Sequence, residues 1–143
     1  MSTPDLQVVR RPQILIVEDD IDLIELWSAL LPLLGCQAFT AKSIVEAKAQ
    51  LLAHPMDVII MDLGLPDGYG LYGIRALLEA PFSGTLRPAI VVISGRSDQN
   101  LIKSIIQAGV ERFLGKPVGK DQIMAVINQI MQRRLAAESG PLL

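Results

Sequence analysis

Short apolar runs alternate along the chain with longer segments in which apolar residues recur every three or four positions. The short runs predict strands at 13–17, 37–41, 58–61, 89–93 and 112–114. The runs at 13–17, 58–61 and 89–93 are rich in β-branched residues, which favour strands. The longer segments predict helices at 21–34, 43–53, 71–79, 98–108 and 121–134. This alternation indicates a parallel sheet with helices on its faces. We therefore predict a doubly wound α/β fold with a five-stranded parallel sheet and five helices on both faces.

Residues with known preferences for helix ends support these boundaries. Gly35 follows the first helical segment, where a glycine commonly ends a helix. Ser43 precedes the second, and Glu46 follows three residues later, which is the spacing of a capping box. In the first helix, steps of three and four define one face that we expect to pack inward, made of Leu23, Leu26, Trp27, Leu30 and Leu34.

Composition places the chain among single-domain globular proteins. It has 143 residues, of which 50% are hydrophobic and 20% charged, and no apolar run reaches the length of about 18 residues that a membrane span needs. The net charge of −2 gives no electrostatic reason for binding nucleic acid or an anionic membrane. The single cysteine, Cys36, cannot form an internal disulfide, and the N-terminus lacks a signal-peptide pattern. We therefore expect a soluble, cytoplasmic protein without direct contact to nucleic acid or membrane.

The pattern also predicts the domain boundaries. All predicted strands and helices fall within 13–134, so we expect one domain there. Residues 1–12 precede the first strand as an N-terminal extension, and 135–143 show no helical period. We predict that 135–143 form a flexible C-terminal tail.

An acidic run directly follows the first predicted strand. The sequence Ile14-Leu15-Ile16-Val17 continues into Glu18-Asp19-Asp20, and adjacent like charges repel each other. One interpretation is a strand end in solvent, with Asp19 or Asp20 capping the next helix. The alternative is a binding site that uses the clustered charge.

Other polar residues decide between these interpretations. Asp62 and Ser94 end the third and fourth strands, and Lys116 follows the fifth. Each could be an ordinary turn residue. However, the carboxyl ends of parallel strands meet at one edge of a sheet, and that edge carries the binding crevice in such folds. The combination therefore favours a site over unrelated turns.

Clustered carboxylates with a nearby lysine and hydroxyl suggest a specific chemistry. Converging carboxylates repel unless a cation lies among them, and a cluster of oxygen ligands suits Mg²⁺. A carboxylate at the centre of the cluster can act as a nucleophile on phosphorus and form an aspartyl phosphate. A metal ion, Lys116 and Ser94 would then screen the phosphoryl oxygens.

With these residues identified, the chain resembles the receiver domain of response regulators in two-component signal transduction, a chemotaxis-regulator-like, flavodoxin-like fold of strand order 2-1-3-4-5. The resemblance covers about 13–134. It depends on the acidic run at Glu18, the segment from Asp57 to Pro66 with Gly70, Ser94-Gly95, Ala108-Gly109, and the segment from Phe113 to Pro117.

The resemblance implies a role for each residue of the site. Asp62 would accept the phosphoryl group, and Lys116 would contact it. Glu18 and Asp19 would hold Mg²⁺ together with Asp62 and the backbone carbonyl of Gly64. Ser94 would be the switch hydroxyl and Phe113 the aromatic side chain that follows it, while Lys116-Pro117 would be a cis peptide bond.

The resemblance also implies partners. A histidine kinase or histidine phosphotransfer protein would donate the phosphoryl group. Phosphorylation would remodel the face formed by the fourth helix, fifth strand and fifth helix, which would control a downstream protein. The domain would be a regulatory module rather than an enzyme, although it would promote its own phosphorylation and slow autodephosphorylation. A homodimer is compatible with the resemblance.

Two rival functions remain open to test. The first is a degenerate receiver that acts as an unphosphorylated interaction module, although no acid, Ser94 or Lys116 is missing. The second is a nucleotide- or flavin-binding protein of the same architecture, but the Gly-x-Gly-x-x-Gly and P-loop patterns are absent. The pattern leaves open the cognate kinase, the output partner, the lifetime of the phosphorylated state and any output domain after Leu143.

Overall fold

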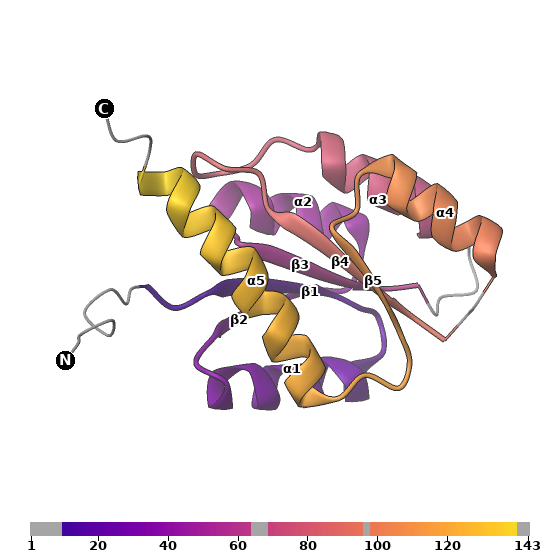
Figure 1. Cartoon of the computed structure of the whole chain (residues 1–143), viewed down its shortest axis with the longest axis horizontal. Helices are drawn as coiled ribbons and strands as arrows, with labels where there is room; N and C mark the ends of the chain where they lie inside the picture. The colour runs from indigo at the N-terminus through magenta and orange to yellow at the C-terminus, as the bar shows by residue number, and fades with distance from the viewer. Residues whose placement is uncertain (1–9, 64–68, 96–97, 140–143) are drawn as a thin grey trace.

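The computed structural model describes residues 10–63, 69–95 and 98–139 and contains five strands and five helices in strict alternation (Figure 1). The strands are β1 (Gln13–Val17), β2 (Gln37–Ala41), β3 (Val58–Asp62), β4 (Ala89–Ser94) and β5 (Arg112–Gly115). The helices are α1 (Ile21–Leu33), α2 (Ile44–Ala53), α3 (Tyr69–Glu79), α4 (Gln99–Ala108) and α5 (Lys120–Ser139). The predicted elements are thus all present, with boundaries shifted by few residues except at the end of α5.

All strand pairs are parallel, and the order in the sheet is β2-β1-β3-β4-β5. This confirms the predicted fold class. The register sets Val17 opposite Met61 and Asp62 opposite Ile93, while Ser94 lies opposite Gly115. The carboxyl ends of β1, β3, β4 and β5 therefore lie at one edge, as predicted from the sequence.

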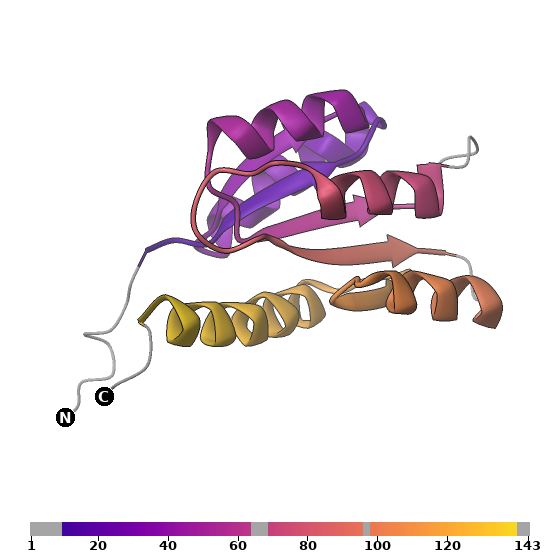
Figure 2. The ribbon, with the colours of Figure 1, turned by 90° about the horizontal axis from the view of Figure 1, so that it is seen from above.

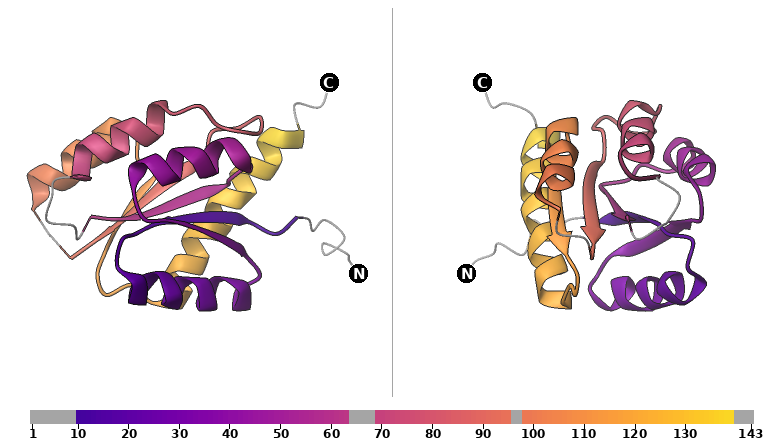
Figure 3. Two further views of the ribbon diagram at one scale, coloured as in Figure 1. Left: turned by 180° about the vertical axis from the view of Figure 1, so that it is seen from behind. Right: turned by 90° about the vertical axis from the view of Figure 1, so that its right-hand side faces the viewer.

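The two faces of the sheet bury separate hydrophobic clusters. On one face, alternate residues of the strands pack against α2, α3 and α4 through Leu51, Leu77 and Ile105. On the other face, the remaining strand residues pack against α1 and α5 through Leu31 and Ile127. Figure 2 shows α2 and α5 on opposite sides of the sheet, and Figure 3 shows α1 and α2 on opposite sides of β1.

The predicted helix caps form. The Ser43 hydroxyl accepts a hydrogen bond from the Glu46 backbone N–H, and Glu46 Oε1 in turn accepts one from the backbone N–H of Lys42. Gly35 follows α1 with a φ of 82°, and Gly109 ends α4 with a φ of 114°, in the left-handed region that favours glycine.

The predicted inward face of α1 is partly wrong. Leu31, which lay outside that face, is the fully buried residue of the helix, whereas Leu26 is 59% exposed. Trp27 and Leu34 pack at the margin of the second cluster. The helix carries apolar residues around much of its circumference, so periodicity alone could not select the face that the sheet covers.

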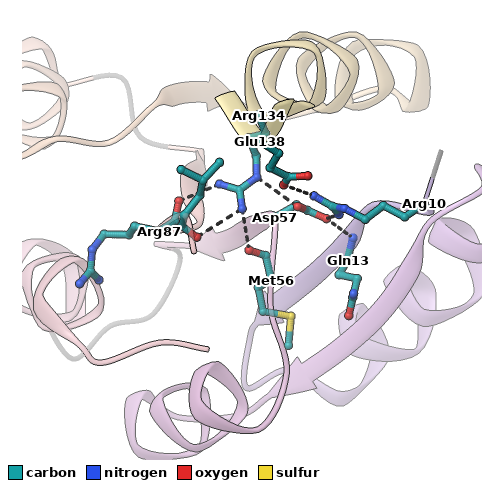
Figure 4. A network of polar contacts seen from close by, with 8 residues as sticks. Arg10, Gln13, Met56, Asp57, Arg87, Arg134 and Glu138 are labelled. Carbon is teal, nitrogen blue, oxygen red and sulfur yellow. Dashed lines mark hydrogen bonds and ion pairs between the residues drawn. The ribbon is translucent and has the colours of Figure 1, made fainter. Parts of the chain in front are cut away.

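The last helix extends beyond its predicted end at Arg134, and a network of charged residues accompanies the extension (Figure 4). Arg134 Nε donates to Asp57 Oδ1 at 3.1 Å, and Arg10 Nη1 donates to Asp57 Oδ2 at 2.6 Å. Arg10 also pairs with Glu138 on the last turn of α5. Residues up to Ser139 therefore belong to the helix, and the predicted irregular tail begins too early because these contacts hold the helix end to β3.

Among the residues that the structure describes, none of the helices combines the length and the apolar character needed to cross a bilayer.

Candidate functional site

The polar residues singled out in the sequence gather at the carboxyl edge of the sheet. Asp62 is the last residue of β3 and Ser94 the last of β4, while Glu18 directly follows β1 and Lys116 directly follows β5. Backbone hydrogen bonds continue the sheet through this edge. The Glu18 N–H donates to the Ala41 carbonyl at 2.9 Å, and the Lys116 N–H donates to the Ser94 carbonyl at 2.9 Å. The fold thus fixes the backbone that carries each side chain.

Lys116 and Asp62 form the central ion pair of this edge. Lys116 Nζ lies 2.5 Å from Asp62 Oδ2, and the two side chains are 40% and 12% exposed. The peptide bond between Lys116 and Pro117 is cis, as the resemblance implied. The Lys116 ammonium therefore contacts the Asp62 carboxylate, which the sequence predicts at the centre of the site.

Glu18 is a buried carboxylate with an unusual environment. Its side chain is almost fully buried, and Oε2 accepts hydrogen bonds from the backbone N–H groups of Asp19 and Asp20, each at 3.1 Å. Within the described residues, Oε1 accepts no hydrogen bond. Burial is the largest influence on the pKa of Glu18 and raises it. The hydrogen bond from the Asp20 backbone lowers the pKa, whereas the nearby Asp62 carboxylate raises it further, so the pKa of Glu18 is about 7.

The capping interpretation of the acidic run is confirmed for Asp20, whereas the binding-site interpretation stays a prediction. Asp20 caps α1, because its Oδ1 accepts hydrogen bonds from the backbone N–H groups of Asp22 and Leu23 at 2.9 and 3.3 Å. Asp19 is exposed, whereas Glu18 turns into the site. The run thus supplies one helix cap and one buried acid.

Two further predicted site residues, Ser94 and Phe113, lie on β4 and β5. Ser94 is fully buried. Phe113 is half-buried on β5 and packs against the cluster that contains α3 and α4. Gly64, expected to offer its carbonyl to a metal ion, lies outside the described residues.

The donor set fits a hard cation in part. In the described ranges, no three acidic, histidine or cysteine side chains form a group that could hold a metal ion. Glu18 and Asp62 do adjoin, and the buried Glu18 Oε1 accepts no hydrogen bond from the described residues. A buried oxygen of this kind is costly unless a cation or donor occupies it, and carboxylate oxygens suit Mg²⁺. The residues present therefore fit a divalent cation that completes its shell with water or backbone oxygens.

One feature of this region was not predicted from the sequence. A cavity of about 440 Å³ adjoins the site and is lined by residues of α1 and of the segment after β5. Trp27, predicted on the inward face of α1, lines this cavity. No local pattern reports how closely a helix approaches the sheet, so the cavity could not be predicted.

The structure is thus a doubly wound α/β domain with an acidic carboxyl edge and a lysine after its last strand, and domains of this class bind their ligands at that edge. Comparisons with known proteins identify the family. Residues 14–128 match the family model described as the response regulator receiver domain. The chain therefore belongs to the receiver domain family.

Individual relatives agree with this assignment. The chain is 32% identical over 127 residues to the transcriptional regulatory protein KdpE of Mycobacterium tuberculosis, covering 87% of this chain and 53% of that protein. It thus spans about half the length of the curated relatives it matches. A solved receiver domain (CheY-like) from Methylobacillus flagellatus superposes with a TM-score of 0.72 at 29% identity, over 84% of this chain and 98% of that chain.

The chain shares its fold with a second solved structure, but their low sequence identity supports no conclusion beyond the fold. It is the receiver domain of the sensor histidine kinase PA1611 from Pseudomonas aeruginosa, with a TM-score of 0.71 at 22% identity, over 85% of this chain and 98% of that chain. It is described with a magnesium ion coordinated in the active-site cleft.

The family assignment confirms the predicted function class. The chain is a receiver domain, which is the phosphorylation-activated switch of two-component signalling, and such domains pair with histidine kinases. Because the relative named above is a transcriptional regulatory protein, the absence of nucleic-acid contact stays a prediction.

Proposed function

We propose that Asp62 is the phosphoacceptor of this receiver domain and that the domain spans 13–134. The observation that carries the proposal is the position of the Asp62 carboxylate at the carboxyl edge, 2.5 Å from Lys116 Nζ and beside the buried Glu18. A carboxylate at this edge can act as the nucleophile on an incoming phosphoryl group, and the adjacent ammonium can neutralise charge on that group.

In the proposed reaction, one Asp62 carboxylate oxygen forms a bond to the phosphorus of a phosphohistidine. The bond between phosphorus and the histidine nitrogen breaks, and the nitrogen leaves with the electron pair. Lys116 then stays beside the new acyl phosphate and balances its negative charge. The donor is a histidine kinase or a histidine phosphotransfer protein. Slow hydrolysis of the same acyl phosphate would return Asp62 to its starting state.

We infer that Mg²⁺ is held by Glu18, Asp19, Asp62 and the Gly64 backbone carbonyl. The buried Glu18 Oε1, which accepts no hydrogen bond from the described residues, supports this assignment. The magnesium described in the PA1611 receiver is consistent with it. When bound, the ion would neutralise charge on the phosphoryl oxygens. Glu18 and Asp19 would orient the ion at the edge beside Asp62.

The switch proposed for this chain connects Ser94 and Phe113. Ser94 would turn its hydroxyl to the phosphoryl group, and Phe113 would move from its half-buried position into the space that this opens. The added charge of about −1.5 to −2 would thus change the face formed by α4, β5 and α5. That face is the proposed contact for a downstream protein or for a second copy of the chain.

The test is intact-mass spectrometry after incubation with acetyl phosphate, with and without Mg²⁺. We expect one phosphoryl adduct on the wild type that requires Mg²⁺, and none on Asp62→Ala. Glu79→Ala is the matched control, because it removes an exposed acid from the end of α3, which precedes β4 and therefore lies at the edge of the sheet opposite the site. It should be phosphorylated as the wild type is.

An equal adduct on Asp62→Ala would place the phosphoryl group elsewhere and contradict the proposal. No adduct on a folded wild type under any of these conditions would instead favour the unphosphorylated interaction module.

A further inference from the structure

The cavity of about 440 Å³ beside the site lies between α1, the sheet and the segment that follows β5. Its walls are mostly apolar. Leu23, Leu26 and Trp27 line it from α1, Pro117 and Val118 line it from the segment after β5, and isoleucines of the central strands form its floor. Three polar residues lie together at one end: Glu18, Asp62 and Lys116.

α1, which lines the cavity, buries fewer side chains than α5 does on the same face of the sheet. α1 buries only Leu31 completely, whereas α5 buries Ile123, Val126, Ile127 and Ile130. Protein interiors are normally close-packed, with few voids larger than a water molecule. A mostly apolar cavity with a few polar groups at one end, in the range of about 300–1,000 Å³, is typical of small-molecule sites.

The polar end of the cavity favours positive charge. The Lys116 ammonium is already paired with Asp62, 2.5 Å away. Glu18 Oε1 is buried and accepts no hydrogen bond from the residues described. A ligand that satisfies both ends of the cavity therefore needs an apolar body and a cationic, hydrogen-bond-donating head.

We propose that this cavity binds a small organic cation with an aromatic or branched aliphatic body, its head at Glu18 and its body beside Trp27. Such a ligand would occupy the oxygen that the proposed function assigns to Mg²⁺, so ligand and metal would exclude each other. Mutual exclusion is reciprocal, since each must weaken the binding of the other by the same factor. The ligand would thus hold Asp62 in its unphosphorylated state. This consequence rests on the proposed function, whereas the cavity binding does not.

Trp27 provides a direct readout, because it is the only tryptophan of the chain and lines the cavity. Benzamidine is a suitable probe: it combines an aromatic ring with a cationic amidine. Titrated into metal-free protein, it should change the Trp27 fluorescence saturably. Benzyl alcohol, which has the same ring without the charge, should bind at least about tenfold more weakly.

Two variants locate the binding. Val118→Phe places a larger side chain in the cavity and should reduce the affinity for benzamidine at least about tenfold. Val45→Phe is the matched control, because Val45 is 78% exposed on α2 and does not line the cavity; it should bind as the wild type does. Glu18→Gln removes the charge at the polar end and should also weaken binding about tenfold or more.

The proposal is overturned by a fluorescence signal that does not saturate, by equal affinities of the wild type and a folded Val118→Phe, or by benzyl alcohol binding as tightly as benzamidine. Circular dichroism checks that each variant is folded. Added Mg²⁺ should raise the apparent Kd for benzamidine. If it does not, the mutual exclusion is wrong. A failure of Asp62 phosphorylation would leave the metal-free titration unchanged, so the two proposals fail separately.

Discussion

Glu18 and Asp57 are both buried carboxylates, and they lie at opposite ends of the central strands. Asp57 accepts hydrogen bonds from Arg10, from Arg134 and from the Gln13 backbone N–H, at 2.6 to 3.1 Å. Glu18 accepts two backbone N–H groups on one oxygen, and its other oxygen accepts none from the described residues. Both carboxylate oxygens of Asp57 therefore accept hydrogen bonds, whereas only one oxygen of Glu18 does so within the described residues.

The pKa values of the two groups follow this difference. Burial alone would raise the pKa of the Asp57 carboxyl, but the hydrogen bonds from Arg10 and Gln13 and the contact with Arg134 hold it below its ordinary value. For Glu18, burial dominates and the nearby Asp62 adds to it, so its pKa is raised to about 7. The Asp57 carboxylate is thus stabilised by its cationic partners, whereas the Glu18 carboxylate has no cationic side chain among its hydrogen-bond donors.

The largest expected effect is the removal of Asp57. Asp57→Ala should lower the free energy of unfolding by about 3–5 kcal/mol, because it leaves the partly buried Arg134 without its counter-ion. Urea denaturation measures this loss. Glu79→Ala, which removes an acid at the end of α3 that is not buried, should change stability by less than about 0.5 kcal/mol and serves as the control. A similar small change for both variants would refute the structural role of Asp57.

The stabilisation by Asp57 should depend on pH in a defined direction. Its folded-state pKa is lower than the ordinary value of 3.8, so its contribution is complete above that value and is lost as the pH falls toward the folded-state pKa. The difference in unfolding free energy between wild type and Asp57→Asn should therefore narrow below a pH of about 4. Urea midpoints across the acid range measure it. A difference that stays constant with pH would contradict the assigned pKa.

A substitution of Glu18 should stabilise the fold, whereas a substitution of Asp57 should destabilise it. At a pH of about 8 and without metal ions, Glu18→Gln should raise the free energy of unfolding by about 1–2 kcal/mol, since it removes a buried charge that is only partly hydrogen-bonded. Denaturation under conditions matched to the Asp57 variants provides the measurement. Destabilisation by Glu18→Gln would mean that Glu18 stabilises the fold as Asp57 does.

The smallest expected effect concerns the N-terminal part of the network. The Arg10 side chain is 37% exposed, so its ion pairs with Asp57 and Glu138 are screened by solvent. Arg10→Ala should lower the unfolding free energy by about 1 kcal/mol or less, and added salt should reduce that difference. A loss as large as that for Asp57→Ala would show that Arg10 rather than Arg134 anchors Asp57.

Most of the fold was predictable because each strand and helix has a local signature. A few consecutive residues are enough to recognise such signatures. Examples are the apolar runs of β1 and β3 and the helix ends at Ser43 and Gly35. The positions of the site residues followed from one further rule, that the ends of parallel strands meet at one edge. The roles of Asp62, Ser94 and Phe113 came from the family resemblance and remain proposals.

The features that escaped prediction depend on contacts between distant segments. Arg134 and Asp57 are separated by most of the domain, and no period or cap in the sequence links them. The extension of α5 to Ser139 follows from that network and from the packing of Leu135 against the core. The exposure of Leu26 and the cavity beside Trp27 depend on which face of α1 packs against the sheet. Several faces of this apolar helix could do so, and the sequence does not select one.

We propose that Glu18 Oε1, which accepts no hydrogen bond from the described residues, lets a cation bind beside Asp62. The most direct measurement is the free energy of unfolding with and without millimolar Mg²⁺, for wild type and Glu18→Gln. A ligand that binds only the folded state stabilises it. We expect Mg²⁺ to stabilise the wild type and to have little effect on Glu18→Gln. Equal stabilisation of both proteins, or of neither, would contradict this proposal.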